Sequence, residues 1–533
     1  MEKTKKVKLV DRYNYIQKPT DKSVTIAWVT KTPSNGQLRW GTTSNQLLNS
    51  IKDSILTQKH VFELTGLIPN TKYYYQTNAI TENKTRVDSF YTAKRKTSTD
   101  FSFLHYGDCG TGKPIQETIG KLMEKETVDF GLVTGDVDQG DGYNYDSVFF
   151  KKYKNMLSHN CHYTAIGNHD GYYNKASTYL DAFHLPVNNG RKPSERYYSF
   201  TWGDAKFICL DSNYGRGVPK GEGVQSDAQK EWLEKELQCN DKKWIFIYFH
   251  HPAYTVAWTG DYYLPIGYLG YKGSYKKQKE WMDLFEKYNV DFVLNGHSHC
   301  YQRGELNGVK YIISGGAGSS SIDFNTNSNA PNIDTELYVN QYVRFDVKGD
   351  TATYISIDIN DNVIDSVSTI KNFVNIRPLL SLNGSVLEST TGNSYTWFLD
   401  GIQITGETDQ NFTPISNGVY EVMTTNQYGC TFMSDPFQYT GTPTLITENN
   451  LLELSVFPNP LKNTLNIVGE LGDIESTLSI RIFNSLGEVL ISSSLEIESS
   501  VNSQIDLSLL SSGIYFLELS TGKERIMKQV IKE

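Results

Sequence analysis

The sequence has no apolar run long enough to span a membrane, so we expect no transmembrane helix. It has no excess of basic residues, and its net charge of −9 argues against nucleic acid as the main partner. The six cysteines are too widely spread for a Cys-x-x-Cys metal site or a dense disulfide scaffold. We therefore expect Cys109 and Cys300 to be buried free thiols. The lysine-rich start, MEKTKKVKLV, is followed by no apolar segment and does not read as a signal peptide, which leaves a cytoplasmic protein or a removed leader.

Hydrophobic residues make up 38% of the chain and aromatic residues 13%, as in globular proteins. With 533 residues, the chain is too long for one core, and three or four domains are expected. Residues 1–97 are predicted to be all-β, because segments such as Ser23–Thr30 and Val61–Leu67 alternate apolar and polar residues. Short strands at this spacing favour a sandwich.

Strands alternate with helices in residues 98–366, which predicts an α/β layered domain. The predicted strands end at Asp108 and Asp136 and cover 163–170, 206–212, 243–252, 290–299 and 309–318, and the helices cover 114–126, 227–237 and 277–289. Residues 367–441 and 448–533 are again all-β, and we expect an Ig-like domain followed by a second β-domain.

Five short motifs carry Asp, Asn and His at the ends of predicted strands. They are Gly107-Asp108, Gly135-Asp136, Gly167–Asp170 (GNHD), Phe249–Pro252 (FHHP) and Gly296–His299 (GHSH). In layered α/β folds, ligands gather beyond the carboxyl ends of the strands. Carboxylate, amide and imidazole groups suit hard or borderline divalent metals, and glycine is expected to allow the sharp turns there.

These ligand types fit a hydrolase that cleaves phosphate esters with two metal ions. Such ions, about 3.5–4 Å apart, activate water and neutralise charge on the phosphate. Asp136 is the candidate bridge, Asp108 and His299 are candidates for the first metal, and Asn168, His250 and His297 for the second. His169 is a candidate to contact phosphate or to protonate the leaving group. A direct role for His251, the neighbour of a ligand, stays open.

The order of the motifs, ending in GHSHCYQR (Gly296–Arg303), resembles that of calcineurin-like metallophosphoesterases, and the GDCG sequence resembles the first motif of purple acid phosphatases within them. The segments VTIAWVT and FELTGLIPNTKYYYQ resemble the fibronectin-like N-terminal domain of the purple acid phosphatases, so that the likeness covers roughly residues 8–360. This resemblance implies a β-sandwich core flanked by helices, the same six ligands, and two divalent or mixed-valence ions of Fe, Zn or Mn. It also implies that His169 faces the substrate.

One position departs from that pattern. Purple acid phosphatases carry an iron-binding Tyr three residues after the bridging Asp, where this chain has Gln139. Other branches carry a His two residues after the first Asp, where this chain has Gly110. Gln139, Asp138 or a water molecule is the candidate for the missing ligand, and the protein is predicted not to be purple.

An aromatic loop follows the FHHP motif, between Tyr254 and Tyr275, and is predicted to overhang the metals. Its aromatic residues include Trp258, Tyr262, Tyr263, Tyr268 and Tyr271. Stacking against a base or an aromatic leaving group and plain loop packing are both open for this loop.

The C-terminal segments SVFPNPLKNTLNI, IFNSLGEVL and LSSGIYFLEL resemble the type IX secretion sorting domain of Bacteroidetes proteins. The resemblance implies a secreted or cell-surface protein, handled by the type IX machinery and made with a leader that this chain lacks. We therefore expect a secreted, acid-phosphatase-like phosphomonoesterase that uses a metal-bridging hydroxide on a small phosphate ester. A phosphodiesterase or nucleotidase on the same site, and a non-catalytic cell-surface binding protein, are the alternatives.

Overall fold

The chain forms two compact units, one of residues 1–377 with 425–432 and one of residues 378–424 with 433–533. The computed structural model describes residues 10–78, 86–94, 100–171, 174–190, 194–214, 218–252, 254–256, 263–264, 268–269, 275–323, 333–371, 377–440, 454–470, 476–484, 488–497, 500–520 and 525–533. Most of the aromatic loop lies outside the described residues. Within the described ranges, no helix combines the length and apolar character that crossing a membrane requires.

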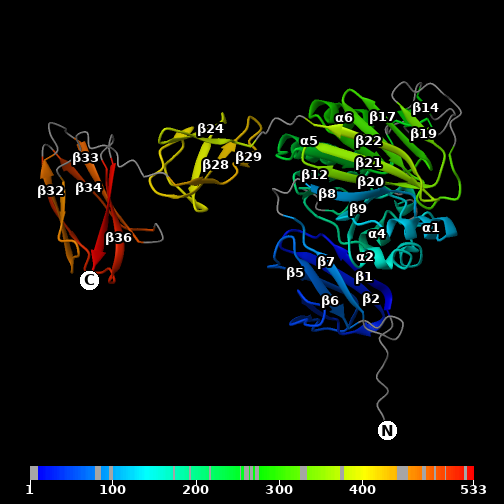
Figure 1. Cartoon of the computed structure of the whole chain (residues 1–533), viewed down its shortest axis with the longest axis horizontal. Coiled ribbons are helices and arrows are strands. Elements are labelled where there is room, and N and C mark those ends of the chain that lie inside the picture. The colour runs from blue at the N-terminus through cyan, green and yellow to red at the C-terminus, as the bar shows by residue number, and fades with distance from the viewer. Residues whose placement is uncertain are drawn as a thin grey trace, which may run out of the picture. The chain divides into compact units, whose positions relative to one another are not determined.

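The N-terminal part of the first unit is a sandwich of two antiparallel sheets. One sheet contains β1 (Val10–Gln17), β2 (Val24–Ser34) and β5 (Thr57–Leu64), and the other contains β4 (Asn49–Lys52), β3 (Gln37–Gly41), β6 (Lys72–Thr77) and β7 (Val87–Tyr91). The alternation of apolar and polar residues buries one face of β5, β6 and β7, and Trp28 and Tyr75 are among the fully buried side chains of the sandwich. Figure 1 shows these strands in blue, next to the cyan part of the chain, and β1 packs against both β10 and α2 there.

The central part of this unit is built from two larger sheets. The first has the order β10 (Cys161–Thr164), β9 (Phe130–Val133), β8 (Asp100–Tyr106), β20 (Gln341–Lys348), β21 (Thr351–Asp358) and β22 (Val363–Ile370). The second has the order β11 (Tyr198–Trp202), β12 (Ala205–Cys209), β13 (Trp244–Tyr248), β16 (Phe292–Asn295), β18 (Val309–Ser314), β17 (Tyr301–Leu306) and β19 (Thr335–Leu337). A short hairpin pairs β14 (Tyr263–Leu264) with β15 (Tyr268–Leu269).

Phenylalanine rings join the two large sheets face to face. The ring of Phe103 on β8 stacks on Phe345 of its own sheet at 4.6 Å, and its edge-to-face partners are Phe207 at 5.4 Å and Phe246 at 5.3 Å in the other sheet. All these rings are buried, and contacts of this kind add to the burial of apolar area. The predicted β-sandwich core is therefore confirmed, and a cluster of aromatic rings lies between its two sheets.

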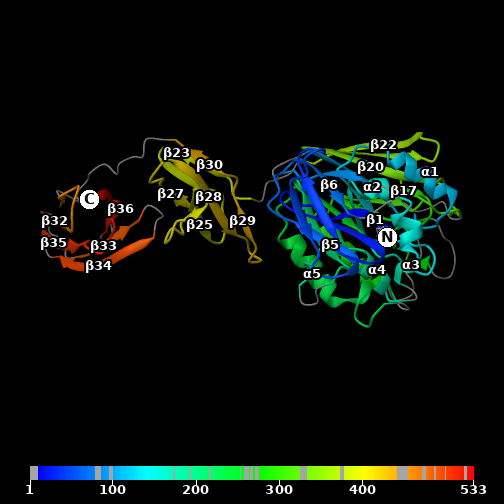
Figure 2. The ribbon, with the colours of Figure 1, turned by 90° about the horizontal axis from the view of Figure 1, so that it is seen from below.

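Helices cover the outer faces of the sandwich (Figure 2). They are α1 (Pro114–Met123), α2 (Lys154–Leu157), α3 (Asn168–Gly171), α4 (Ser177–Ala182), α5 (Asp227–Gln238) and α6 (Tyr275–Lys287), with a π-helical turn at Asp146–Phe150 and a 3₁₀ turn at Gly223–Gln225. The three long helices lie where the apolar periodicity predicts them. Pro114 starts α1, and the Ser226 side chain caps α5 by accepting the Gln229 backbone N–H.

The second unit contains two further β-domains. The first of them, for which an Ig-like domain is predicted, has sheets of β23 (Leu380–Asn383), β24 (Val386–Ser389) and β27 (Asn411–Phe412), and of β26 (Ile402–Gln403), β25 (Tyr395–Leu399), β28 (Gly418–Thr425) and β30 (Phe437–Tyr439), and β29 (Thr431–Met433) begins in the segment 425–432 of the first unit. The last part has sheets of β31 (Ser455–Phe457), β32 (Thr464–Glu470) and β35 (Ser500–Asp506), and of β34 (Val489–Ile497), β33 (Ser476–Phe483), β36 (Gly513–Ser520) and β37 (Arg525–Lys532). The predicted multidomain fold class is confirmed.

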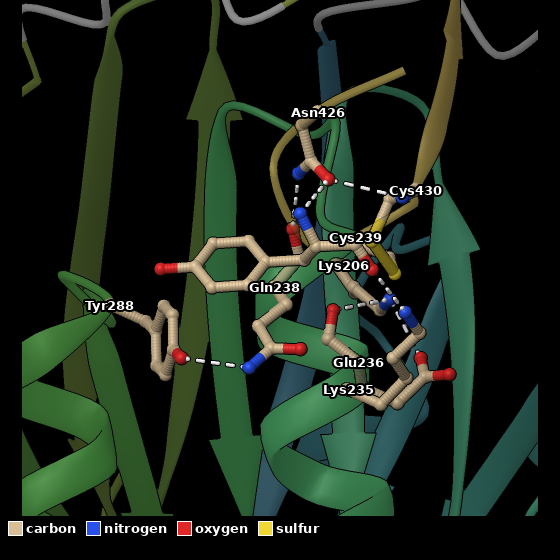
Figure 3. The surroundings of a disulfide bond; sticks show 9 residues. Lys206, Lys235, Glu236, Gln238, Cys239, Tyr288, Asn426 and Cys430 are labelled. Atoms are coloured by element: carbon tan, nitrogen blue, oxygen red, sulfur yellow. Dashed lines mark hydrogen bonds and ion pairs between the residues drawn. A yellow bond between two sulfur atoms is a disulfide. The ribbon is translucent and has the colours of Figure 1, made fainter. Parts of the chain in front are cut away.

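A disulfide joins Cys239, just after α5, to Cys430 in the segment 425–432 of the same unit (Figure 3). Asn426 reinforces this junction, because its side-chain amide donates to the Gln238 carbonyl at 3.2 Å and its side-chain oxygen accepts the Cys430 N–H at 3.0 Å. The sequence analysis missed this pair. Cys109 and Cys300 are buried free thiols, as predicted.

Candidate metal centre

The candidate ligands meet where parallel strands of both large sheets end. Strands β8, β9 and β10 are parallel neighbours, and Asp108, Asp136 and Asn168 follow their carboxyl ends. Strands β13 and β16 are parallel in the facing sheet, and His250 and His297 follow them. Because the sheets pack face to face, the strand ends of both contribute to one site.

Three of these residues adopt left-handed backbone conformations, with φ of 57° at Asp108, 50° at Asp136 and 66° at His297. Few residues other than glycine do so, although Asp and His are among the more tolerant, and such strain gathers at functional sites. Of the neighbouring glycines, Gly135 has a φ of 87° and turns the chain as expected, whereas Gly167 and Gly296 serve for close approach. A Cβ on Gly167 would lie 2.1 Å from Asp136 Oδ1, and one on Gly296 would lie 2.6 Å from Asp108 Oδ2.

The His250 ring is the centre of one group of ligand atoms. Its Nε2 lies 2.9 Å from Asn168 Oδ1, 3.4 Å from Asp136 Oδ1 and 3.1 Å from His297 Nδ1. On the other side of the ring, Nδ1 lies 2.8 Å from the Thr134 carbonyl oxygen, to which it donates. This bond fixes the ring and leaves Nε2 facing the other ligand atoms, an arrangement typical of metal-binding histidines.

Asp108 and His299 form the other group. His299 Nε2 lies 3.5 Å from Asp108 Oδ1, an oxygen that is fully buried and has no hydrogen-bond partner among the described residues. Asp108 Oδ2 accepts the backbone N–H of His297 at 2.7 Å. The His299 ring is oriented by Ser319, whose Oγ lies 2.8 Å from Nδ1, and the His299 backbone N–H donates to Asp323 at 2.8 Å.

Burial and mutual charge shift the titration of these groups. Burial alone would lower the pKa of His250, but the Asp136 and Asp108 carboxylates raise it to about 9. Burial raises the pKa of Asp136, but the charge and hydrogen bond of His250 outweigh it and lower that pKa to about 2. Burial, helped by Asp136, raises the pKa of Asp108. Buried carboxylates so close together favour a bound cation.

Two groups of described side chains have the spacing to hold a metal ion: Asp108, Asp136 and His250, and His250, His251 and His297. Within each group the ligand atoms lie within 4.8 Å of one another. The carboxylate and imidazole donors, with the Asn168 amide oxygen beside them and a buried Asp108 oxygen that no hydrogen bond of the described residues reaches, fit borderline divalent metals such as zinc, iron or manganese.

Of the other three predicted residues, His251 belongs to the second of these groups, and His169 and Gln139 lie beside the centre. The His251 ring is 4.5 Å from that of His297, and burial, with His250, lowers the pKa of His251 to about 3. The His169 backbone N–H donates to Asp136 Oδ1 at 3.0 Å, while its ring Nδ1 lies 3.1 Å from the Gly140 carbonyl oxygen. The Gln139 side-chain amide donates to the Asp108 carbonyl at 2.7 Å, so it contacts the backbone of a candidate ligand.

Asp138, the other named candidate for the missing ligand, holds its own loop. Its two carboxylate oxygens accept the backbone N–H groups of Gly140 and Asn144, each at 2.8 Å. These bonds tie the buried Asp138 side chain to the loop that follows Asp136.

Sequence reasoning missed Asp170, the last residue of the GNHD motif. Its buried carboxylate accepts backbone N–H groups from Gly167 at 2.8 Å, Asp138 at 3.1 Å and Val137 at 3.3 Å, and the Tyr145 hydroxyl donates to it at 3.0 Å. Asp170 thus ties the loop that carries Asn168 to the loop that follows Asp136. Asp170 lies in the same motif as the candidate ligand Asn168, and this position was a signal in the sequence. Asp323 and Ser319 lie farther along the chain, outside the five motifs, and had no such signal.

Comparison with known protein families agrees with this geometry. Residues 101–301 match the calcineurin-like phosphoesterase family. The chain carries a calcineurin-like phosphoesterase domain. In front of this domain, residues 13–99 match the purple acid phosphatase N-terminal domain, and at the end of the chain residues 455–533 match the secretion system C-terminal sorting domain.

Relatives of the phosphoesterase-containing part include purple acid phosphatases. A purple acid phosphatase from Glycine max is 24% identical over 328 residues, which are 55% of this chain and 66% of that protein. Acid phosphatase type 7 from Homo sapiens is 25% identical over 309 residues, which are 53% of this chain and 67% of that protein. The chain thus spans about two thirds of the length of these two relatives and about half of several others, such as the 49% of a Mycobacterium tuberculosis protein.

Solved structures share the fold. The purple acid phosphatase from seeds of yellow lupin aligns with a TM-score of 0.57 at 18% identity, over 69% of this chain and 75% of that one. The structure of PhoD aligns with a TM-score of 0.52 at 14% identity, over 83% of this chain and 95% of that one. At these identities, the likeness concerns the fold alone.

Proposed function

We propose that this protein is an exported metal-dependent phosphatase that hydrolyses phosphomonoesters with two metal ions. The observation that carries the proposal is the convergence of Asp108, Asp136 and His250, whose ligand atoms lie within 4.8 Å of one another at the meeting strand ends. In this proposal Asp136 bridges the two ions, Asp108 and His299 hold one, and Asn168, His250 and His297 hold the other.

Two bound ions would lower the pKa of a shared water, so that hydroxide attacks phosphorus, and would neutralise the phosphate oxygens. The protein supplies rigid positioning, since the strained loops at Asp108, Asp136 and His297 are fixed by buried hydrogen bonds. His169 and His251 are the candidates to contact phosphate, and His169, the more exposed of the two, to protonate the leaving group.

Gln139 takes a supporting part in this proposal. Its amide nitrogen holds the Asp108 backbone, which leaves its amide oxygen or a water molecule to complete the first metal's ligands. Iron, zinc and manganese all remain candidates, and a relative from Arabidopsis thaliana is named as an Fe(3+)-Zn(2+) purple acid phosphatase.

Two observations support export. The last residues match a secretion sorting domain, and Cys239 and Cys430 form a disulfide, which persists mainly in oxidising surroundings outside the cytoplasm. In a Bacteroidetes host with type IX secretion, the full chain behind a Sec leader should reach the surface or the medium. The same chain without residues 448–533 should stay inside the cell, and equal export of both would contradict the proposal.

The catalytic test is hydrolysis of p-nitrophenyl phosphate by the full chain, loaded in turn with iron, zinc and manganese, beside Asp136→Asn. The matched control is Asp181→Asn, an exposed Asp on α4 paired with Lys59. We expect Asp136→Asn to lose about a hundredfold or more in kcat and the control to match the wild type. Faster cleavage of bis-p-nitrophenyl phosphate would indicate a diesterase. No turnover by folded, metal-loaded protein would favour a surface binding protein.

A further inference from the structure

A cleft of about 550 Å³ lies between the N-terminal sandwich and the phosphoesterase domain, within one compact unit. Its wall includes Val128, just before β9, and His162, at the start of β10. The candidate metal ligands follow the opposite, carboxyl ends of these same strands. The cleft is therefore separate from the proposed catalytic site, and clefts between domains are common places for small ligands.

One polar atom in the wall of this cleft has no partner. The His162 side chain is 1% exposed, and its Nδ1 lies 2.8 Å from the Tyr106 hydroxyl. Its Nε2 is buried and has no hydrogen-bond partner among the described residues. Because a buried ring nitrogen without a partner loses the hydrogen bond that it makes to water in the unfolded chain, a bound group that reaches Nε2 would recover that loss. Burial lowers the pKa of His162 to about 4, so the ring offers one neutral hydrogen-bonding atom.

Part of the wall is apolar, beside polar residues such as Thr127 and Asn160. Leu104 on β8, Met123 at the end of α1 and Met156 on α2 line the cleft together with Val128. Leu104, Met123 and Met156 belong to the buried core, and Met156, at 8% exposed, is the most accessible of the three. Methionine side chains are polarizable and adapt well to flat rings. This composition suits an apolar, ring-shaped body of modest size.

The exposed part of the cleft carries a positively charged side chain, that of Lys72. The Lys72 ammonium lies over the rings of Tyr74 at 5.2 Å and of Tyr91 at 5.8 Å, contacts that leave N–H groups for an anion. The other charged groups of the wall are held within the protein. Glu126 pairs with Arg344 at 2.6 Å, and Arg86 donates to Asn155 at 3.0 Å.

Glu124, the remaining carboxylate of the wall, accepts from the Asn155 side-chain amide at 2.7 Å. His159 is also engaged, since its Nδ1 lies 2.8 Å from the Asn155 carbonyl oxygen. Lys72 is thus the charged side chain of this wall that is best suited to meet a ligand.

We propose that this cleft binds a small aromatic acid. Its ring would lie against Met156, a hydrogen-bonding group would reach His162 Nε2, and its acidic group would face Lys72. The site is a second, non-catalytic binding site of the first compact unit, and it does not depend on the metal centre or on the proposed phosphatase activity.

The test is a fluorescence titration of the full chain with 8-anilinonaphthalene-1-sulfonate, an aromatic anion that brightens when it leaves water. We expect one bound probe per chain, displaced by 4-hydroxybenzoate but not by inorganic phosphate. Lys72→Gln should weaken the dissociation constant about fivefold, as expected for loss of one partly exposed charge pair. Met156→Trp, which fills the cleft, should abolish binding.

Lys52→Gln is the matched control, because Lys52 is an exposed lysine on β4 of the same sandwich and does not line the cleft. It should bind the probe as the wild type does. Wild-type binding by Lys72→Gln, or displacement of the probe by phosphate, would overturn the proposal. If Met156→Trp loses its wild-type melting temperature, the Lys72→Gln result alone decides.

Discussion

Nε2 of His250 and Oδ1 of Asn168 lie 2.9 Å apart, while the opposite nitrogen of the same ring donates to the Thr134 carbonyl. With Nδ1 committed to the backbone, Nε2 is the atom that can bind a metal, and the amide oxygen beside it is a second neutral ligand. His250 follows a strand of the second large sheet and Asn168 follows a strand of the first, so this contact joins residues from both sheets. The pair joins the two halves of the sandwich at the candidate metal centre.

We expect His250→Ala to weaken metal binding by at least about tenfold, because the variant removes a ligand atom shared by both groups. The measurement is zinc retained after dialysis, with zinc per chain determined by mass spectrometry. His159→Ala, at an exposed histidine outside this centre, is the control. Full zinc retention by a folded His250→Ala variant would contradict the assignment of His250.

The iron-loaded wild-type protein is expected to lack a phenolate-to-iron band in the visible spectrum. Gln139 stands where a tyrosine ligand would be required, and its amide donates to the Asp108 carbonyl. Gln139→Tyr, loaded with iron, should gain such a band, and Gln139→Phe, which has no hydroxyl, should not. A purple wild-type protein would show that another tyrosine binds iron.

Asp170→Asn is expected to destabilise the first unit and to lower its metal content. One amide oxygen cannot accept from all four donors that now reach the Asp170 carboxylate. Each donor left without a partner costs about 1–3 kcal/mol, so the melting temperature should fall by several degrees.

Tyr145→Phe removes one of these donors and is the milder companion variant. This variant should lower the free energy of unfolding by about 1 kcal/mol and should retain its metal. Equal melting temperatures for Asp170→Asn and the wild type would show that the two loops are held by other contacts.

Glu195 is expected to make the protein less stable as the pH rises from about 4.5 to about 7. Burial raises the pKa of Glu195 from 4.5 to about 7, and one of its carboxylate oxygens is buried without a hydrogen-bond partner among the described residues. A raised carboxyl pKa means that the folded state binds more protons than the unfolded state in this range, so stability is full below pH 4.5 and is lost as the pH rises.

The free energy of unfolding of Glu195→Gln should therefore exceed that of the wild type by about 1–2 kcal/mol at pH 8 and should equal it at pH 4. Thermal unfolding at both pH values measures this difference. Glu231→Gln, at an exposed position on α5, is the control and should change neither. If the free energies of unfolding of Glu195→Gln and the wild type differed equally at both pH values, burial of the charged Glu195 carboxylate would not be the cause.

Much of the centre was predictable because its residues follow strands. Asp108, Asp136 and His250 each come directly after a buried apolar segment, and parallel strands bring their carboxyl ends together. The resemblance to a known family then supplied the sandwich core. The backbone at the site was only partly predictable, since Gly135 has the expected positive φ but Asp108, Asp136 and His297 also adopt left-handed conformations, and Gly167 and Gly296 provide space.

Contacts between distant segments left no signal in the sequence. Cys239 and Cys430 are separated by 191 positions and carry no common motif, so only the fold pairs them. Asp323 and Ser319 lie in a polar loop, and their contacts with His299 depend on how that loop returns to the site. The aromatic loop prediction lies outside the described residues and stays a prediction.

The disulfide also divides the metal centre along the chain. His250, His297 and His299 lie inside the covalent ring that Cys239 and Cys430 close, while Asp108, Asp136 and Asn168 lie before it. A protease that cuts once anywhere within this ring produces two fragments that stay on one molecule. Such a nicked protein keeps its full mass on a non-reducing gel, and its two sets of candidate ligands cannot diffuse apart.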